Sequence, residues 1–375
     1  MDEGFDFAAL RRHPDVEAPN LFASDAADRL LLDEAAEAIA AAGPGTVAVV
    51  GDAYGALTLG AAALHGATGI RTHQDALSGE RALAANAARA GLQGAYRSHA
   101  LDAALLDGAR VVLLRLPRSL DALDEAAEAI ARWAAADVRV YASGMVKHMS
   151  TTMNDVLRRR FGRIDVTHAR QKARVLVASD PLPPGKPGWP RSRVDTATGL
   201  VIVAHGAAFA GAAVDVGTRM LLAHLDEAMP AARHAIDLGC GTGVIAVELA
   251  RRRPGLRVLA SDQSAAAVAS ARETAAANGV ADRVEVVRDD ALSAQPDASA
   301  EFVALNPPFH IGAAVHAGIA HKLFADAGRV LAPGGELWAV WNSHLRHRPA
   351  LERLVGPTRQ IARDRTFTVT ASVRR

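Results

Sequence analysis

Cysteine is almost missing from this 375-residue chain, which contains a single one, Cys240. One cysteine excludes an internal disulfide framework and favours a reducing compartment. Apolar runs long enough to span a membrane are also missing. Residues 1–4 lack the basic start and apolar core of a signal peptide. We therefore expect a cytoplasmic protein with no membrane partner.

An excess of charge of one sign is absent as well, because 42 basic and 41 acidic residues leave a net charge of +1. Any contact with nucleic acid must then come from a local basic patch and not from the overall field. What the chain does have is length and apolar content. Half of its residues are hydrophobic, and 375 residues correspond to two domains of ordinary size.

An internal repeat organises the chain. A shift of 188 positions places Gly51 on Gly239 and Gly55 on Gly243, and the same shift lays residues 83–91 over residues 271–279 without a gap. This register predicts a duplicated α/β unit. Chance similarity between two alanine-rich α/β units is the alternative interpretation.

The two halves differ in their polar residues. Where the second half has Asp237, Gly241 and Asp262, the first has Val49, Ala53 and Gln74, and residues 115–118 stand opposite residues 306–309. These exchanges remove each polar group that could hold a ligand, so the first half is interpreted as a silent copy kept for structure or for binding. The residues that the first half has at these positions are Val49, Ala53, Gln74 and Arg115.

Proline marks the boundary between the halves. Residues 180–190 contain five prolines, which remove backbone donors and disfavour helix. We predict a degenerate domain over residues 1–180, a proline-rich linker over 181–198 and a catalytic domain over 199–375.

Residues 235–250 join a short apolar run, an acid and three glycines to a stretch with helical spacing. This order predicts a strand, a tight loop and a helix. Gly239, Gly241 and Gly243 allow the backbone to bend sharply and to approach a ligand closely. Asp237 precedes them, where a carboxylate repels a pyrophosphate and suits a cation; the spacing also differs from the G-x-G-x-x-G of dinucleotide sites. A structural turn without a ligand is the alternative.

Acids also follow the next two predicted strands. Residues 256–262 end in Asp262, at the point where an α/β nucleotide-binding fold holds ribose hydroxyls with a carboxylate. Residues 283–288 lead into Asp289 and Asp290. One such acid is compatible with a solvated loop, but three acids after three successive strands predict a single binding site.

The fourth strand of this half leads into Asn306, Pro307, Pro308, Phe309 and His310. Prolines fix the backbone and remove N–H donors, so the Asn306 side-chain oxygen and the Pro307 carbonyl are expected to be rigid acceptors. Two such acceptors can hold an exocyclic amine, and Phe309 can stack on a base. A proline turn without chemistry is the alternative.

The loop at Asp237 resembles the first motif of the class I S-adenosylmethionine-dependent methyltransferases. This resemblance implies two tandem Rossmann-like domains and S-adenosyl-L-methionine as the cofactor. It places Asp237 and the three glycines beside the methionine end, and Asp262 at the ribose. At the adenine amine it implies Asp290, which fits that position better than Asp289.

The Asn-Pro-Pro-Phe motif is similar to that of methyltransferases that act on planar amines, among them adenine, cytosine, guanine and glutamine amides. The resemblance implies that Asn306, Pro307, Pro308 and Phe309 are catalytic and that Asn306 also lies beside the cofactor. It places Phe309 and His310 at the substrate. Transfer to such a nitrogen needs no strong base, since the fixed acceptors stabilise its developing positive charge.

Several features together resemble the bacterial ribosomal RNA guanine-N2 methyltransferases. They are the Asn-Pro-Pro-Phe-His-x-Gly form of residues 306–312, the Asp-Val-Gly-Thr turn at 215–218, the degenerate first half and the total length. Elements at 147–151 and 342–345 are more similar to the large-subunit enzyme, which implies 23S ribosomal RNA as the partner. The alternatives are 16S ribosomal RNA, a protein glutamine or a small-molecule amine.

Basic residues concentrate ahead of the proline-rich segment, where they outnumber Asp155 and Asp165. The concentration predicts contact with an RNA backbone. A solvated helix face followed by an edge strand is equally compatible with it. The candidates for substrate binding are Arg158, Arg159 and Arg160.

The remaining expectations concern metal, assembly and the last strand. Four histidines, at 310, 316, 321 and 344, lack metal-ligand spacing and a cysteine cluster, so we expect no metal. Trp338 and Trp341 are expected to pack in a core. Residues 365–373 alternate as an edge strand does. We expect a monomer.

Overall fold

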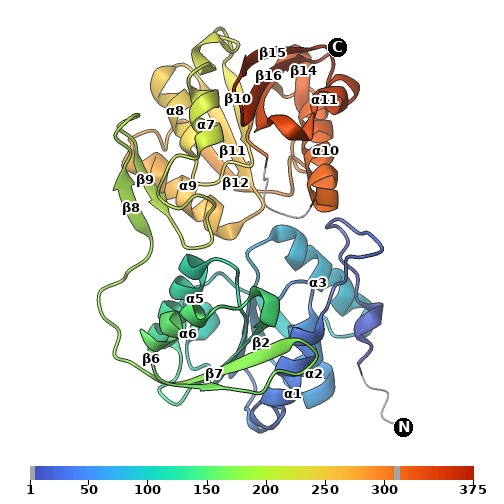
Figure 1. Ribbon diagram of the computed structural model, residues 1–375, viewed down its shortest axis with the longest axis vertical. Helices are drawn as coiled ribbons and strands as arrows, with labels where there is room; N and C mark the ends of the chain where they lie inside the picture. Colours follow the sequence, from blue (N-terminus) through green and yellow to red (C-terminus); the bar gives the residue numbers. More distant parts are fainter. Residues whose placement is uncertain (1–4, 308–312) are drawn as a thin grey trace. The chain divides into compact units, whose positions relative to one another are not determined.

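The computed structural model describes residues 5–307 and 313–375, without the side chains of residues 313–317. It divides into two compact units, Met1–Trp189 and Pro190–Arg375 (Figure 1). Within the described residues each unit has one seven-stranded sheet, and the second adds a two-stranded sheet.

The first unit alternates helices and strands up to a closing β-hairpin. Its elements are η1 (Phe7–Ala9), α1 (Ala26–Ala41), β1 (Val47–Val50), α2 (Ala56–His65), β2 (Ile70–His73), α3 (Leu77–Ala90), β3 (Tyr96–Ser98), α4 (Ala103–Leu106), β4 (Val111–Arg115), α5 (Leu120–Trp133), β5 (Arg139–Met145), η2 (Val146–His148), α6 (Thr151–Arg158), β6 (Phe161–Val166) and β7 (Ala173–Pro181).

The second unit begins with a hairpin and then repeats the same order. Its elements are β8 (Arg191–Val194), β9 (Val201–Ala204), α7 (Val216–Leu222), η3 (Leu225–Glu227), β10 (His234–Leu238), α8 (Val244–Arg252), β11 (Arg257–Asp262), α9 (Ala265–Ala277), β12 (Val284–Arg288), β13 (Ala300–Leu305), α10 (Ala313–Val330), β14 (Leu331–Asn342), η4 (Ser343–Leu345), α11 (Arg348–Leu354), β15 (Thr358–Arg363) and β16 (Phe367–Val373).

The strand orders confirm the predicted duplication. The first sheet runs β3-β2-β1-β4-β5-β7-β6 and the second runs β12-β11-β10-β13-β14-β16-β15, so each strand has a counterpart in the same place. In each sheet the first five strands of this order are parallel, and the last two form an antiparallel hairpin. Two tandem α/β units with Rossmann-like order are therefore present.

Helices cover both faces of the second sheet (Figure 1). One core joins the sheet to α7, α8 and α9, and the other joins it to α10 and α11. Along β10, Ala235 belongs to the first core, whereas Ile236 and Leu238 belong to the second. The strand alternation therefore turns Asp237 toward the face that α8 covers.

The proline-rich connection is fastened to the first unit. The Gly188 N–H donates to the carboxylate of Glu128 on α5 at 2.9 Å, and the Trp189 indole donates to Asp124 at 3.1 Å. Strand β8 then begins at Arg191, within the residues predicted as linker, and pairs with β9.

One expectation about the last strand is wrong. Strand β16 lies between β14 and β15, so the edge strand is β15 and not β16. The polar residues of β16 face neighbours on both sides, as in the hydrogen bond between Thr358 and Ser372. The two tryptophans of β14, Trp338 and Trp341, are buried as expected. Across the described residues, no helix is long and apolar enough to cross a membrane.

Candidate active site

The carboxyl ends of β10, β11, β12 and β13 bring the predicted site residues together. In the register, Leu238 pairs with Ser261 on one side and with Leu305 on the other. The residues that follow these positions are Gly239, Asp262 and Asn306, and they therefore lie at the same edge of the parallel sheet. The structure therefore brings these predicted residues to one edge of the sheet, and their role in binding stays a prediction.

The three glycines of the loop have two different tasks. Gly239, Gly241 and Gly243 all have positive φ, at 70°, 53° and 78°. A Cβ added at Gly239 or Gly241 would meet nothing within 4 Å, whereas one at Gly243 would lie 2.9 Å from the Cβ of Ala271. The first two glycines keep space open in front of the loop, and Gly243 lets α8 pack closely on α9.

Asp237 is fully buried beneath the loop. Its Oδ2 accepts a hydrogen bond from the Ala246 N–H of α8 at 2.9 Å, and its Oδ1 has no partner among the described residues. Burial first, and the nearby charge of Asp262 second, raise the pKa of this carboxyl to about 7. A buried carboxylate oxygen without a donor is costly, so it fits a site that takes a cation.

The carboxylate of Asp262 is fixed against the loop. Its Oδ2 accepts from the Gly241 N–H at 3.0 Å and its Oδ1 accepts from the Ser264 N–H at 2.9 Å. An ionised carboxylate has about four acceptor sites, so these two bonds leave capacity for a hydroxyl pair. The group is held rigidly where the ribose was predicted.

The two acids after β12 have different environments. Asp289 closes its own turn, because it accepts from the Asp290 N–H at 2.8 Å, the Ser293 hydroxyl at 2.5 Å and the Ala294 N–H at 2.8 Å. Asp290 instead accepts from the ammonium group of Lys322 on α10 at 2.5 Å. Asp289 is thus engaged within its own turn, and the role of Asp290 at the adenine amine stays a prediction. Lys322 was missed, because its lone position in a helix carries no sequence signal.

Asn306 is held by the start of helix α7. Its Nδ2 donates to Asp215 Oδ2 at 3.1 Å and to Thr218 Oγ1 at 2.9 Å. Its Oδ1 is buried and has no partner among the described residues. Asp215 also caps α7 by accepting from the Gly217 and Thr218 N–H groups. In the sequence, an Asp directly before an apolar helical stretch is an N-cap signal, but the contact of Asp215 and Thr218 with Asn306 was not visible there.

The other parts of the predicted motif are described only in part. Pro307 is buried beside Asn306. Pro308, Phe309 and His310 lie outside the described residues, so their predicted roles stay predictions. The part of the chain that the structure describes contains no cluster of three or more His, Cys, Asp or Glu side chains that could hold a metal.

The three predicted RNA-contacting arginines are not alike. Arg158 and Arg159 are more than half exposed, and each lies near one acid, Asp155 at 3.0 Å and Asp124 at 3.9 Å. Arg160 is three-quarters buried and lies 2.6 Å from Glu128 on α5, the same carboxylate that binds the connection. Arg158 and Arg159 can therefore meet a ligand, whereas Arg160 is engaged inside the unit.

The corresponding loop of the first unit is closed by its own side chain. Gln74 follows β2 as Asp262 ends β11, but its Nε2 donates to the carbonyls of Asp52 at 2.8 Å and Ala53 at 3.0 Å. An amide donor thus replaces the carboxylate acceptor. This reversal agrees with the interpretation of the first unit as a silent copy.

Comparisons with known proteins cover nearly the whole chain. A family model described as Methyltransferase small domain matches residues 199–371, and one described as RLMG N-terminal domain matches residues 1–181. The Ribosomal RNA large subunit methyltransferase G of Streptomyces coelicolor is 36% identical over 97% of this chain and 97% of its own. The protein of that name from Pseudomonas paraeruginosa is 35% identical over 96% of each chain.

A solved structure extends the likeness to the fold. The T. thermophilus 16S rRNA N2 G1207 methyltransferase (RsmC), in complex with AdoMet and guanosine, gives a TM-score of 0.74 with 22% identity, over 94% of this chain and 92% of that one. The likeness spans both units and so includes the duplication. Since it is 36% identical to a relative over 97% of both chains, the chain belongs to the ribosomal RNA large subunit methyltransferase G family.

Proposed function

We propose that the protein transfers a methyl group from S-adenosylmethionine to the exocyclic N2 amine of a guanine in 23S ribosomal RNA. The observation that carries this proposal is the Asn306 amide at the end of β13. Both hydrogens of its Nδ2 are engaged by Asp215 and Thr218, and its buried oxygen is left as an acceptor. A fixed acceptor at this edge suits a substrate that donates N–H bonds, as an exocyclic amine does.

The residues of the second unit fit the cofactor. The open space at Gly239 and Gly241 would allow a ligand to approach the loop, and Asp262, which is held by the Gly241 N–H, would accept from the ribose hydroxyls. Asp290 would accept from the adenine amine, and Asp237 would supply negative potential beneath a cationic ligand. When bound, the cofactor would supply a methyl group, whose carbon would bond to the amine nitrogen as its bond to sulfur breaks, and the nitrogen would release one proton to water.

The chain's own groups act on the amine. Asn306 Oδ1 and the Pro307 carbonyl would accept its two N–H bonds and so fix the direction of the nitrogen lone pair. As the nitrogen becomes positive, these acceptors bind it more strongly, which stabilises the transition state more than the ground state. If the guanine is paired, it must first leave the stack, at a cost of a few kcal/mol.

The choice of 23S RNA rests on the names of the relatives. The two relatives described above are large-subunit enzymes with 36% and 35% identity, whereas the structure named as a 16S enzyme has 22%. The first unit is proposed to contribute binding and not chemistry. Its exposed Arg158 and Arg159 would contact RNA phosphates.

The proposal is tested by methyl transfer from labelled S-adenosylmethionine to purified 23S RNA, 16S RNA and bulk protein from cells that lack this gene. Label in 23S RNA that is released as N2-methylguanine on digestion is the expected result. Label in 16S RNA would change the partner but leave the chemistry. Label in protein alone would overturn the RNA substrate.

A further inference from the structure

An amide side chain has a donor end and an acceptor end of nearly the same shape. Which end of Asn306 faces the substrate decides whether the site binds a donor, such as an amine, or an acceptor, such as a carbonyl. The two groups that surround its other end are Asp215 and Thr218, both on the first turn of α7 or its cap. They lie 91 and 88 residues away along the chain, so the fold creates this contact.

The chemistry of Asp215 fixes the orientation of the amide. An ionised carboxylate only accepts hydrogen bonds, so it pairs with the Nδ2 of Asn306 and would repel its oxygen. The Thr218 hydroxyl accepts the second Nδ2 hydrogen at 2.9 Å. With both hydrogens engaged, only Oδ1 remains to face the substrate. The nearby negative charge also polarises the amide and strengthens its oxygen as an acceptor.

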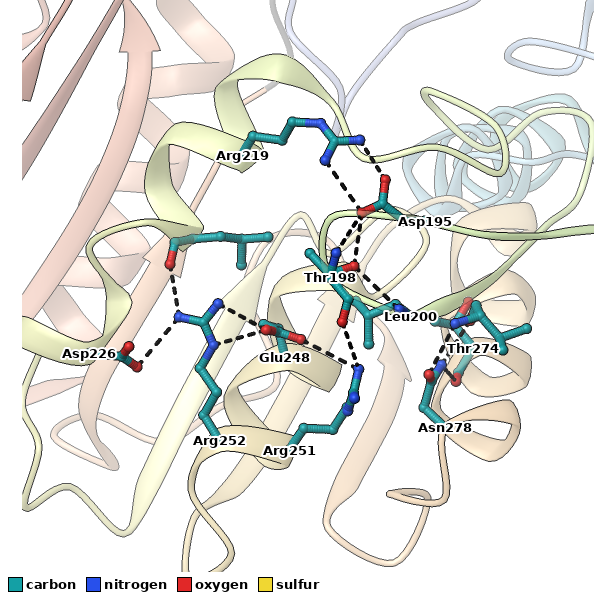
Figure 2. A network of polar contacts seen from close by, with 12 residues as sticks. Asp195, Thr198, Leu200, Arg219, Asp226, Glu248, Arg251, Arg252, Thr274 and Asn278 are labelled. Atoms are coloured by element: carbon teal, nitrogen blue, oxygen red, sulfur yellow. Dashed lines mark hydrogen bonds and ion pairs between the residues drawn. The ribbon is translucent and has the colours of Figure 1, made fainter.

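Helix α7 is itself anchored, which gives this contact a rigid support. Figure 2 shows Arg219 of α7 pairing with Asp195, at 2.5 Å and 3.3 Å to its two carboxylate oxygens. Asp195 also accepts from the Thr198 N–H at 3.0 Å and hydroxyl at 2.9 Å. Asp195 lies on the loop between β8 and β9, and Arg219 lies one helical turn after Asp215.

The first unit has the same contact with different chemistry. Asp25 caps α1, and Arg115, at the end of β4, pairs with Asp25 at 2.7 Å and with Asp28. There two acids hold a guanidinium, which has donors only. A helix start that holds the strand end is thus common to both units. In the second unit it holds an amide and leaves one acceptor.

We propose that Asp215 and Thr218 are positioning residues that commit the Asn306 amide to present its oxygen, and that they thereby make the site select an exocyclic amine over a carbonyl. This inference rests on the proposed function. Neither residue needs to touch the substrate. The two residues affect kcat because they hold Asn306 Oδ1, which accepts a hydrogen bond from the amine, in one orientation.

The test uses the full chain with Thr218→Val, Thr218→Ser and Asp215→Asn, assayed on 23S RNA. Valine keeps the shape of threonine but removes the acceptor, and asparagine keeps the cap but loses the charge. We expect both to lower kcat by about 10- to 100-fold, as a misplaced reacting group does. The cofactor Kd, measured by calorimetry, should stay within about twofold, a change worth less than 1 kcal/mol. Thr218→Ser should recover most of the lost turnover.

The matched control is Asp102→Asn, which alters the N-cap of α4 in the first unit. It should leave kcat at the wild-type value and report the effect of changing a cap alone. The positioning role is overturned if Thr218→Val and Asp215→Asn have the kcat of the wild type. It is also overturned if the kcat of Thr218→Ser is as low as that of Thr218→Val. A wild-type protein that methylates no RNA would instead overturn the proposed function, and the inference with it.

Discussion

Arg115 of the first unit occupies the position that Asn306 has in the second. Leu114 pairs with Val50 of β1 as Leu305 pairs with Leu238 of β10, and Arg115 and Asn306 come next. Burial opposes its charge, but the neighbouring carboxylates of Asp25 and Asp28 outweigh that effect and raise the pKa of Arg115. A permanently charged donor at this position cannot hold an amine.

The first prediction concerns the number of cofactors per chain. We expect calorimetry to give one S-adenosylmethionine per chain, because Gln74 donates to the carbonyls that face it and closes the first loop. Replacement of Asp262 by Ala should remove this binding, since its carboxylate also holds the Gly241 N–H. Gln74→Ala is the matched control and should bind as the wild type does. If Asp262→Ala still binds one S-adenosylmethionine per chain, or the wild type binds two, the first unit is not silent.

The second prediction concerns Asn306. Replacement by Ala removes the amide oxygen that Asp215 and Thr218 hold in position. We therefore expect kcat to fall by about 10²- to 10³-fold, the usual cost of losing one preorganised polar group. The cofactor Kd should change little, because the glycine loop and Asp262 are untouched. Single-turnover rates and calorimetry measure the two effects. Turnover near the wild-type value would move the chemistry away from this residue.

A control for this variant is Asn278→Ala. Asn278 also bonds across the fold, to the backbone N–H and carbonyl of Val201, but it caps the C-terminus of α9, away from the carboxyl ends of the strands. It should lower the melting temperature without a selective loss of kcat. The comparison separates a loss of stability from a loss of chemistry.

Much of the fold was predictable because it repeats. The ungapped register from Gly51 to Gly239 and from Gly55 to Gly243 follows from backbone geometry, since all four glycines adopt positive φ. The acids at strand ends were predictable because parallel strands bring their carboxyl ends together. These features depend on local pattern, which a sequence displays directly.

What could not be predicted are contacts between distant segments. The pairing of Lys322 with Asp290 depends on how α10 packs, and the wrong placement of β16 at the edge arose because alternation does not reveal strand order. The role of Asp215 and Thr218 depends on their hydrogen bonds to Asn306, which form because the start of α7 packs against the end of β13. Such contacts are fixed by tertiary packing and leave no spacing in the sequence.

The third prediction separates RNA contact from stability in the basic stretch. Charge reversal of Arg158 and Arg159 should weaken RNA binding. It should also lower the slope of log Kd against log salt concentration by about 1 to 2, because exposed cations displace counterions at phosphates. The melting temperature should not change. Filter binding at several salt concentrations measures the slope. An unchanged slope would favour a solvated helix face over an RNA contact.

The fourth prediction concerns Arg160, which acts inside the first unit. Replacement by Met leaves the buried carboxylate of Glu128 with one partner fewer. We expect a loss of about 1–3 kcal/mol in the free energy of unfolding, the usual cost of an unmet buried polar group. Denaturant melts measure it. A variant with wild-type stability and weakened RNA binding would instead assign Arg160 to the RNA surface.

The buried carboxyl of Asp237 makes a pH dependence expected. Its pKa is raised by burial from 3.8 to about 7, so folding favours its protonated form. The stability that this group contributes is then fully present below its unfolded pKa and is lost as pH rises through about 7. A cationic ligand favours the ionised form and opposes this loss.

The last prediction follows for Asp237→Asn, which cannot ionise. Between about pH 4 and about pH 7 the melting temperature of the ligand-free wild type should fall relative to that of the variant, because in this range the folded wild type keeps the Asp237 proton that the unfolded chain has lost. Cofactor binding to the wild type should release protons in this range, seen as a dependence of the calorimetric enthalpy on the buffer, and the variant should bind more weakly and release fewer. Parallel melting curves with equal proton release would show that Asp237 is already ionised, and that its negative charge is stabilised by the fold and not by the ligand.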